Sequence, residues 1–311
     1  MKDPGLWKPA LRYGREVLKA KMAAAFADTG LIDLMSRVRT VTLGPRVHVL
    51  GYHRVVDHLD VTGRGSPVNP ALCITTDAFR RQMEQVRERF DVLSLDEAMR
   101  AIDGELHLER DACAITFDDG YHDVFARAHP VLAELDLPAT VFVPTGPATT
   151  GAFLPHDRLY AAFWQALRTR RPLAGAEVGE LAPWLARAEA AARLDGPAAA
   201  VDLLIAEQPA AALDRIADAL ERHLGGALPL DSGARVLDPT ELRALSDAGW
   251  EIGAHTVSHV VLTHEPLERV RHELERPRQD LEAWTGRRCR FFAYCNGLHS
   301  RAVVDAARRA G

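Results

Sequence analysis

Short apolar runs alternate with amphipathic segments along most of the chain. We predict strands over the near-continuous apolar runs at 47–52, 113–117, 139–143, 250–254 and 290–294. Helical spacing of apolar positions predicts helices over 76–90, 96–103, 123–135, 240–248, 266–284 and 300–309, with a kink at Pro277. Strands separated by helices in this order indicate parallel βαβ units, and therefore an α/β fold.

Polar residues that follow the predicted strands are candidates for chemistry. His53 follows the first run, Asp118 and Asp119 follow the second, and His255 follows the run at 250–254. In parallel α/β barrels, reactive side chains collect at the carboxyl ends of the strands. We therefore expect these residues to converge at one edge of the sheet, together with the turn at 294–297.

Two segments depart from this alternation. The first, about 150–236, is rich in Ala, Leu, Arg and Glu, which predicts several helices inserted between two strands. The second, 6–38, also has helical spacing, and all four lysines lie within the first 21 residues of the chain. We predict an N-terminal helical arm over 1–46 and a body over 47–311. The arm either packs on the body or lies as a basic amphipathic helix on an anionic membrane surface.

Composition and charge exclude several classes of protein. The 311 residues carry a net charge of -5, with 47% hydrophobic and 26% charged residues, as in an ordinary globular protein. The arm is basic and the body is acidic. Because nucleic-acid binding needs a basic surface on the folded domain, the acidic body argues against it.

The sequence contains no predicted membrane span or signal peptide. No apolar run approaches the ~18 residues that a spanning helix needs, and the first thirty residues carry too many charges for a signal peptide. The cysteines form no C-x-x-C pair and indicate reduced thiols. We expect a protein of the cytoplasm or the cytoplasmic membrane face; its oligomeric state is left open.

Two short motifs point to metal-assisted hydrolysis. Asp118 and Asp119 precede Gly120, and His255 is followed four positions later by His259. One carboxylate and two imidazoles make a three-ligand set that suits Zn²⁺, Fe²⁺, Co²⁺ or Mn²⁺. A second carboxylate beside them can take a proton from an attacking water.

The chain resembles the polysaccharide deacetylases of the NodB-homology type, carbohydrate esterase family four. The residues that carry the resemblance are YHRV at 52–55, TFDDGY at 116–121, LPATVFV at 137–143, HTVSH at 255–259 and FAYCNG at 292–297. These segments occur in the order found in that family. The resemblance covers about 47–150 and 237–311, with its motif core within 112–311.

The resemblance implies a distorted (β/α)7-type barrel that removes acetyl groups from the N-acetylated sugars of a polysaccharide or glycan precursor. It implies that Asp118 is the general base. It also implies that Asp119, His255 and His259 hold one divalent transition metal, zinc first, with Co, Fe, Mn or Ni as alternatives. The further residues expected to bind the substrate or its oxyanion are Tyr121, Asn296 and His53.

Two features of the chain differ from the family pattern. Cys295 stands where the third motif usually has Pro, and it is a tolerated loop residue, an extra metal ligand or a redox-sensitive thiol. Gly311 ends the sequence where the family continues through further strands, one of which bears a general-acid His. We therefore expect the barrel to lack its C-terminal strands.

Three hypotheses remain open on the sequence alone. The first is an active N-deacetylase. The second is a truncated or catalytically impaired domain that binds metal or glycan without turnover. The third is another metal-dependent hydrolase, such as an esterase that acts on O-acetyl groups, because the same site attacks amide and ester carbonyls.

Overall fold

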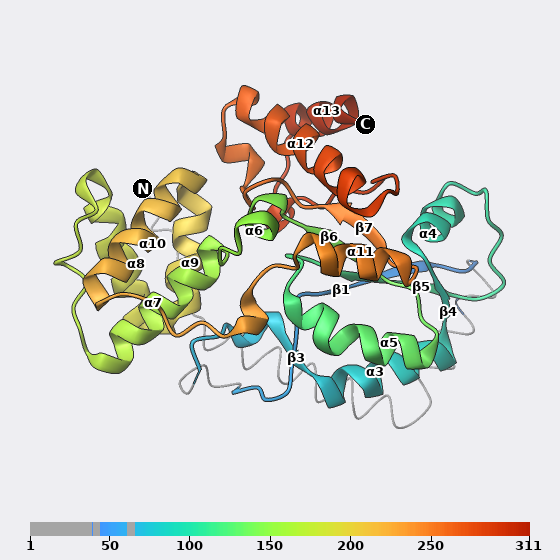
Figure 1. Ribbon diagram of the computed structural model, residues 1–311, viewed down its shortest axis with the longest axis horizontal. Coiled ribbons are helices and arrows are strands. Elements are labelled where there is room, and N and C mark those ends of the chain that lie inside the picture. Colours follow the sequence, from blue (N-terminus) through green and yellow to red (C-terminus); the bar gives the residue numbers. More distant parts are fainter. Residues whose placement is uncertain (1–38, 40–43, 61–65) are drawn as a thin grey trace.

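The computed structural model describes residues 39, 44–60 and 66–311 (Figure 1). The predicted helix over 6–38 and most of the predicted arm over 1–46 lie outside the described residues. The rest of the chain forms an α/β body and a lobe of helices beside it.

A parallel five-stranded sheet forms the centre of the body. Its strands are β1 (Val47–Tyr52), β4 (Asp91–Leu93), β5 (Ala112–Phe117), β6 (Thr140–Val143) and β7 (Glu251–Ala254). β1 pairs along the whole of β5, β4 pairs with the first half of β5, β6 pairs with its end, and β7 pairs with β6. Each of these pairings is parallel, which confirms the α/β prediction.

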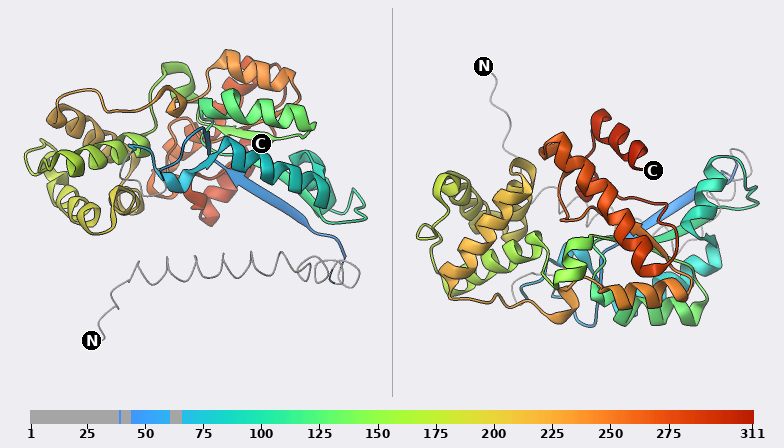
Figure 2. Two further views of the ribbon diagram at one scale, coloured as in Figure 1. Left: turned by 90° about the horizontal axis from the view of Figure 1, so that it is seen from below. Right: turned by 45° about the horizontal axis from the view of Figure 1, so that its top comes forward.

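The sheet does not close into a complete barrel within the described residues. β1 is at one end of the strand order and β7 is at the other, with no pairing between them in the described part of the chain. Figure 2 shows β1 as the blue strand at this edge of the sheet. Val49 on β1 is 53% exposed. A smaller parallel pair, β2 (Arg54–Val56) with β3 (Cys73–Thr75), continues the chain after β1.

The helices of the body follow the hydrophobic pattern closely. They are α3 (Thr76–Arg89), α4 (Leu95–Ile102), α5 (His129–Leu135), α6 (Thr145–Thr150), α11 (Pro239–Asp247), α12 (Leu267–Thr285) and α13 (Arg301–Ala310). Capping boxes begin α4 at Ser94 and α11 at Asp238, and each side chain satisfies backbone N–H groups of the first turn. A π-helical turn, Val124–Ala128, precedes α5. α12 continues through Pro277.

The predicted strand over 290–294 is wrong as a regular strand. It is reduced to a single parallel bridge between Phe292 and Ala254, with Ala293 N donating to Ala254 O at 3.0 Å. Only one end of β7 supports it, and no strand pairs with its other edge within the described residues. The three-residue strands β2, β3 and β4 went unpredicted because they are too short to show a period.

The inserted segment forms a helical lobe, as predicted. It contains α7 (Pro155–Thr169), α8 (Ala182–Asp195), α9 (Pro197–Glu207) and α10 (Ala210–Leu224), which gather at the left of Figure 1. The lobe has its own apolar core, which includes Leu159, Phe163, Leu204, Ile216 and Leu220. None of the described helices is long and apolar enough to cross a membrane.

The core of the body lies against the sheet. Phe117 on β5 contacts the rings of Tyr52, Phe79 and Trp250, with centroid separations of 5.5–5.8 Å. Because these rings fix β1, β5, α3 and the start of β7 relative to one another, they also fix the strand ends that carry the predicted motifs.

Candidate active site

The two predicted motifs meet at the carboxyl edge of the sheet. Asp118 and Asp119 directly follow β5, and His255 directly follows β7. Backbone hydrogen bonds extend the sheet into both motifs: Asp118 N donates to Tyr52 O at 2.8 Å, and His255 N donates to Val143 O at 3.1 Å. Parallel pairing therefore places the motifs side by side although 136 positions separate Asp119 from His255.

A carboxylate between two imidazoles is the centre of the site. Asp119 Oδ1 lies 2.8 Å from His259 Nε2 and 3.3 Å from His255 Nε2. The other ring nitrogen of His255, Nδ1, lies 2.9 Å from Ala293 O, so Nε2 is the nitrogen directed at the carboxylate. Asp119 is 3% exposed and His255 is 2% exposed. Three donor atoms thus converge in a dry environment.

The titratable groups of the cluster shift one another's pKa values. Burial acts to raise the pKa of Asp119, but the imidazoles of His259 and His255 hold it well below its usual value. Burial acts to lower the pKa of His259, but Cys295 and Asp119 raise it to about 10. Protons shared among such groups are the ones that a divalent metal displaces. The oxygen and nitrogen donors therefore fit a transition metal.

Asp118 has a different environment from Asp119. Its side chain is half-buried and lines a cavity of about 270 Å³. Burial raises the pKa of Asp118, the charge of His255 offsets part of the rise, and the charge of Asp119 adds to it. Two adjacent carboxyls with pKa values shifted in opposite directions are typical of sites that divide metal binding and proton transfer between them.

The same cavity contains most of the residues that the sequence pointed to. The predicted residues that line it are His53, Asp118, Asp119, His255, His259 and Asn296. The side chain of Tyr121, which was also predicted to bind the substrate, does not line this cavity. Its hydroxyl donates instead to Asp157 Oδ2 at 2.8 Å.

Four residues of the site have left-handed backbone conformations. Asp119, Thr256, His259 and Asn296 have φ values of 67°, 67°, 53° and 56°. Residues other than glycine adopt such conformations at a cost, and the cost is typically tolerated where a side chain must be aimed precisely. Three of the four lie in turns that directly follow β5 or β7.

Comparison with known proteins decides the family. The family model described as "Polysaccharide deacetylase" matches residues 106–179 and 196–311, more than half of the chain. This chain belongs to the polysaccharide deacetylase family. Membership makes it a deacetylase-type hydrolase with a polysaccharide as the implied class of substrate.

Solved structures support the fold of a deacetylase. The chain is similar to the Streptococcus pyogenes deacetylase PplD in complex with acetate, with a TM-score of 0.54 and 17% identity over 85% of this chain and 80% of that one. It is also similar to a de-N-acetylase from Aggregatibacter actinomycetemcomitans, with a TM-score of 0.52 and 14% identity over 85% of each chain. No curated protein sequence matches it.

The helical lobe adds a histidine to the deacetylase site that sequence reasoning missed. His156, in the first turn of α7, lines the cavity and has Nε2 2.8 Å from the Tyr121 hydroxyl and 3.7 Å from Asp119 Oδ2. Burial lowers the pKa of His156. The only sequence signal was a Pro-His-Asp run at the start of a helix outside the recognised motifs.

A buried carboxylate from α12 holds the turn that carries both histidines. Glu273 Oε2 accepts hydrogen bonds from Val257 N at 2.8 Å and from Ser258 N at 2.9 Å. Glu273 is 2% exposed, and its Oε1 lies 3.5 Å from the Nε of Arg269. Sequence reasoning missed it because α12 is rich in charges, most of which face solvent.

Cys295 reaches the same cluster from the third motif. Its Sγ, one nitrogen of His255 and one nitrogen of His259 all lie within 4.8 Å of one another. Burial acts to raise the pKa of Cys295, but the charges of the two imidazoles lower it to about 6. The cysteine that departs from the family pattern is therefore part of the site.

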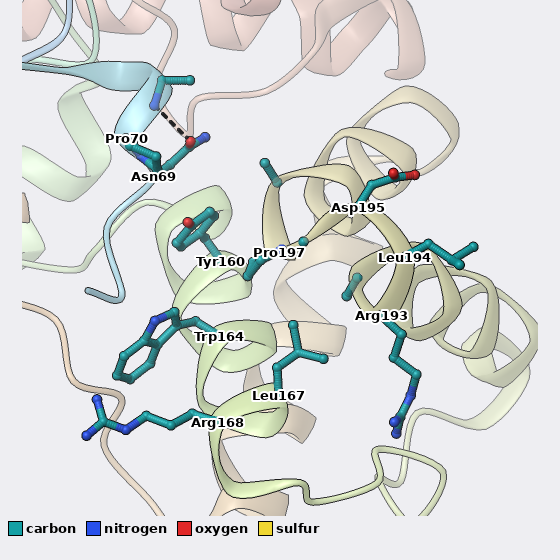
Figure 3. A pocket seen from close by; sticks show the side chains of 14 residues that line it. Asn69, Pro70, Tyr160, Trp164, Leu167, Arg168, Arg193, Leu194, Asp195 and Pro197 are labelled. Carbon is teal, nitrogen blue, oxygen red and sulfur yellow. Dashed lines mark hydrogen bonds between the residues drawn. The ribbon is translucent and has the colours of Figure 1, made fainter. Parts of the chain in front are cut away.

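A second cavity of about 680 Å³ adjoins the site at Asn69 (Figure 3). Tyr160, Trp164 and Arg168 of α7 line one side of it, facing the connection between α8 and α9. The Arg168 guanidinium lies 5.1 Å from the centroid of the Trp164 ring. The lobe and the body thus together line this second cavity, which shares Asn69 with the cavity of the motif residues.

Proposed function

We propose that this deacetylase is a metal-dependent enzyme that removes acetyl groups from the N-acetylated sugars of a polysaccharide or glycan precursor. The observation that carries the proposal is the contact of Asp119 Oδ1 with the Nε2 atoms of His255 and His259, next to Asp118 on one cavity wall. The family supports the deacetylase activity; the metal, the residue roles and the N-acetyl preference are our proposals.

Asp119, His255 and His259 would hold the metal. Carboxylate oxygen and imidazole nitrogen suit Zn²⁺ best, with Co²⁺, Fe²⁺, Mn²⁺ and Ni²⁺ as alternatives. Ala293 O accepts a hydrogen bond from His255 Nδ1 and so holds the orientation of the ring. Metal-binding histidines commonly have such a partner on their second ring nitrogen. When bound, the metal would polarise the acetyl carbonyl as a Lewis acid.

Asp118 would act as the general base. It lines the cavity, and its raised pKa brings it closer to the range in which a carboxylate removes a proton from water. The carboxylic acid formed in this way can then return its proton to the departing amine. The backbone around Asn296, with His53, would contribute to substrate and oxyanion binding. Tyr121 is fully buried and does not line the cavity, so its predicted substrate contact is not part of this proposal.

The glycan would extend from the 270 Å³ cavity past Asn69 into the 680 Å³ cavity. With one acetylated sugar bound at Asp118, the neighbouring sugars of the chain would lie beside Tyr160 and Arg168. The polar groups of these two side chains can form hydrogen bonds with sugar hydroxyls. We propose accordingly that the body over 47–311 is the catalytic unit and that the insertion at about 150–236 forms part of its binding surface.

Acetate release is the test of this function. The substrates are N-acetylated and O-acetylated glycan oligomers assayed side by side. Asp118→Asn should lower kcat roughly 10²–10⁴-fold with metal content unchanged, and His255→Ala should lose both metal and activity. Asp103→Asn, which removes the exposed carboxylate at the C-cap of α4, is the matched control.

Each outcome bears on a separate part of the proposal. Full activity in the Asp118 and His255 variants would overturn the residue roles. Faster release from O-acetylated oligomers would replace the N-acetyl assignment. A wild-type chain that binds metal but releases no acetate from either substrate would identify a metal-binding domain without turnover.

A further inference from the structure

Cys295 differs from the other cysteines in what surrounds its sulfur. Cys113 Sγ and Cys289 Sγ each lie 3.7 Å from a backbone carbonyl, and Cys73 Sγ lies 3.4 Å from one. Cys295 instead lies beside the imidazoles of His255 and His259. Its Sγ and one nitrogen of each ring are within 4.8 Å of one another. All four cysteines of the chain lie in its described part.

The contacts of the Cys295 sulfur leave it available as a ligand. Sγ lies 3.7 Å from His255 O and 3.8 Å from Thr256 Oγ1, and sulfur forms only weak hydrogen bonds at such distances. The residue is 1% exposed, so water does not satisfy the thiol either. A buried sulfur beside two imidazole ligands is a typical donor for a soft transition metal.

We propose that Cys295 Sγ joins His255 and His259 as a further protein ligand of the metal centre. The potential ligand atoms of these three residues lie within 4.8 Å of one another, and Asp119 Oδ1 contacts both imidazoles. This inference rests on the metal centre of the proposed function and assigns to this chain a ligand that the family pattern, with Pro at the position, does not contain. With Asp119 as a ligand too, one further position for substrate would require zinc to expand from four to five ligands, as it does in some catalytic sites.

A thiolate ligand would affect which metal ions the site prefers. Sulfur prefers Zn²⁺ and Co²⁺ to Mn²⁺ or Mg²⁺, which prefer oxygen. Cys295→Ser keeps the size of the side chain and replaces sulfur by oxygen. We expect the Kd for Zn²⁺ to rise by more than the roughly 10–100-fold that loss of an outer-shell partner costs. The Kd for Mn²⁺ should change far less.

Absorption spectroscopy of the full chain loaded with Co²⁺ tests the ligand directly. Cobalt bound to a thiolate has an intense sulfur-to-cobalt charge-transfer band in the near ultraviolet, whereas nitrogen and oxygen ligands give only the weaker visible bands. We expect the band in the wild type, its loss in Cys295→Ser, and its retention in Cys289→Ser, which removes another buried thiol.

The outcomes separate this inference from the proposed function. About one Co²⁺ per wild-type chain with visible bands but without the charge-transfer band would overturn the Cys295 ligand and leave the Asp-His-His centre intact. A charge-transfer band that survives in Cys295→Ser would also overturn it. Failure of the folded wild type to bind either Co²⁺ or Zn²⁺ would overturn the metal centre itself. The wild-type spectrum keeps the test valid if Cys295→Ser does not fold.

Discussion

Replacing Glu273 with glutamine tests how the histidine turn is held. The substitution keeps the shape of the side chain but removes its charge. Glu273 Oε2 accepts two backbone hydrogen bonds, at 2.8 and 2.9 Å, from the residues between His255 and His259. Bonds to a charged group contribute roughly 1.5–3 kcal/mol each, against about 0.5–1.5 kcal/mol for neutral ones. The glutamine oxygen can still accept, so each bond loses about 1–1.5 kcal/mol.

The expected loss of stability for Glu273→Gln is therefore about 2–3 kcal/mol. The weakened pairing with Arg269, which is partly exposed, adds at most about 1 kcal/mol. Urea unfolding should show a lower midpoint at an unchanged m value. Because the turn positions two proposed ligands, we also expect the Kd for Zn²⁺ to rise roughly 10–100-fold.

Glu275→Gln is the control for this experiment. Glu275 lies two positions further along α12 and is exposed, so the same chemical change should alter stability by less than about 0.5 kcal/mol. If Glu273→Gln unfolds at the same urea concentration as Glu275→Gln, the carboxylate does not hold the turn and the reasoning is refuted. The stability readout applies whether or not metal is bound.

Three further substitutions test contacts that hold the helices and loops against the sheet. Gly146 N donates to Val257 O at 2.8 Å, and a Cβ on Gly146 would lie 2.9 Å from that oxygen; Gly146→Ala should cost about 1–3 kcal/mol in urea unfolding. Glu251 accepts two N–H groups of the first turn of α4, so Glu251→Ala should cost about 1–3 kcal/mol per unsatisfied donor by the same assay. Trp250 Nε1 donates to His129 Nδ1 at 3.1 Å, and burial lowers the pKa of His129 below its usual 6.5. The unfolded state then binds more protons, so stability should fall as pH drops below about 6.5, and less steeply in His129→Gln; equal slopes would contradict this.

Much of the fold follows from local pattern. The runs at 113–117 and 139–143 are strands within one residue at each end, and both are fully buried, as continuous apolar runs in a parallel sheet are expected to be. The run at 47–52 is a strand with the predicted bounds, although it lies at the edge of the sheet and is only partly buried. The run at 290–294 is apolar after Arg290 but forms only a bridge. Its backbone meets β7 only around Ala254, and sequence pattern does not report how far two segments run side by side.

The candidate site, like the fold, was predicted from the sequence only in part. The sequence alone predicted Asp118, Asp119 and His255, because each follows an apolar strand and parallel strands end at one edge, and it predicted His259 by its spacing from His255. Only the tertiary structure decided that His156, Glu273 and Cys295 lie beside them. The sequence around His156 and Glu273 resembles an ordinary helix start and a charged helix face. For Cys295 the sequence left a loop residue, a metal ligand and a redox-sensitive thiol open. Proximity between such segments is set by how helices and sheet pack, which depends on side chains far from the motifs.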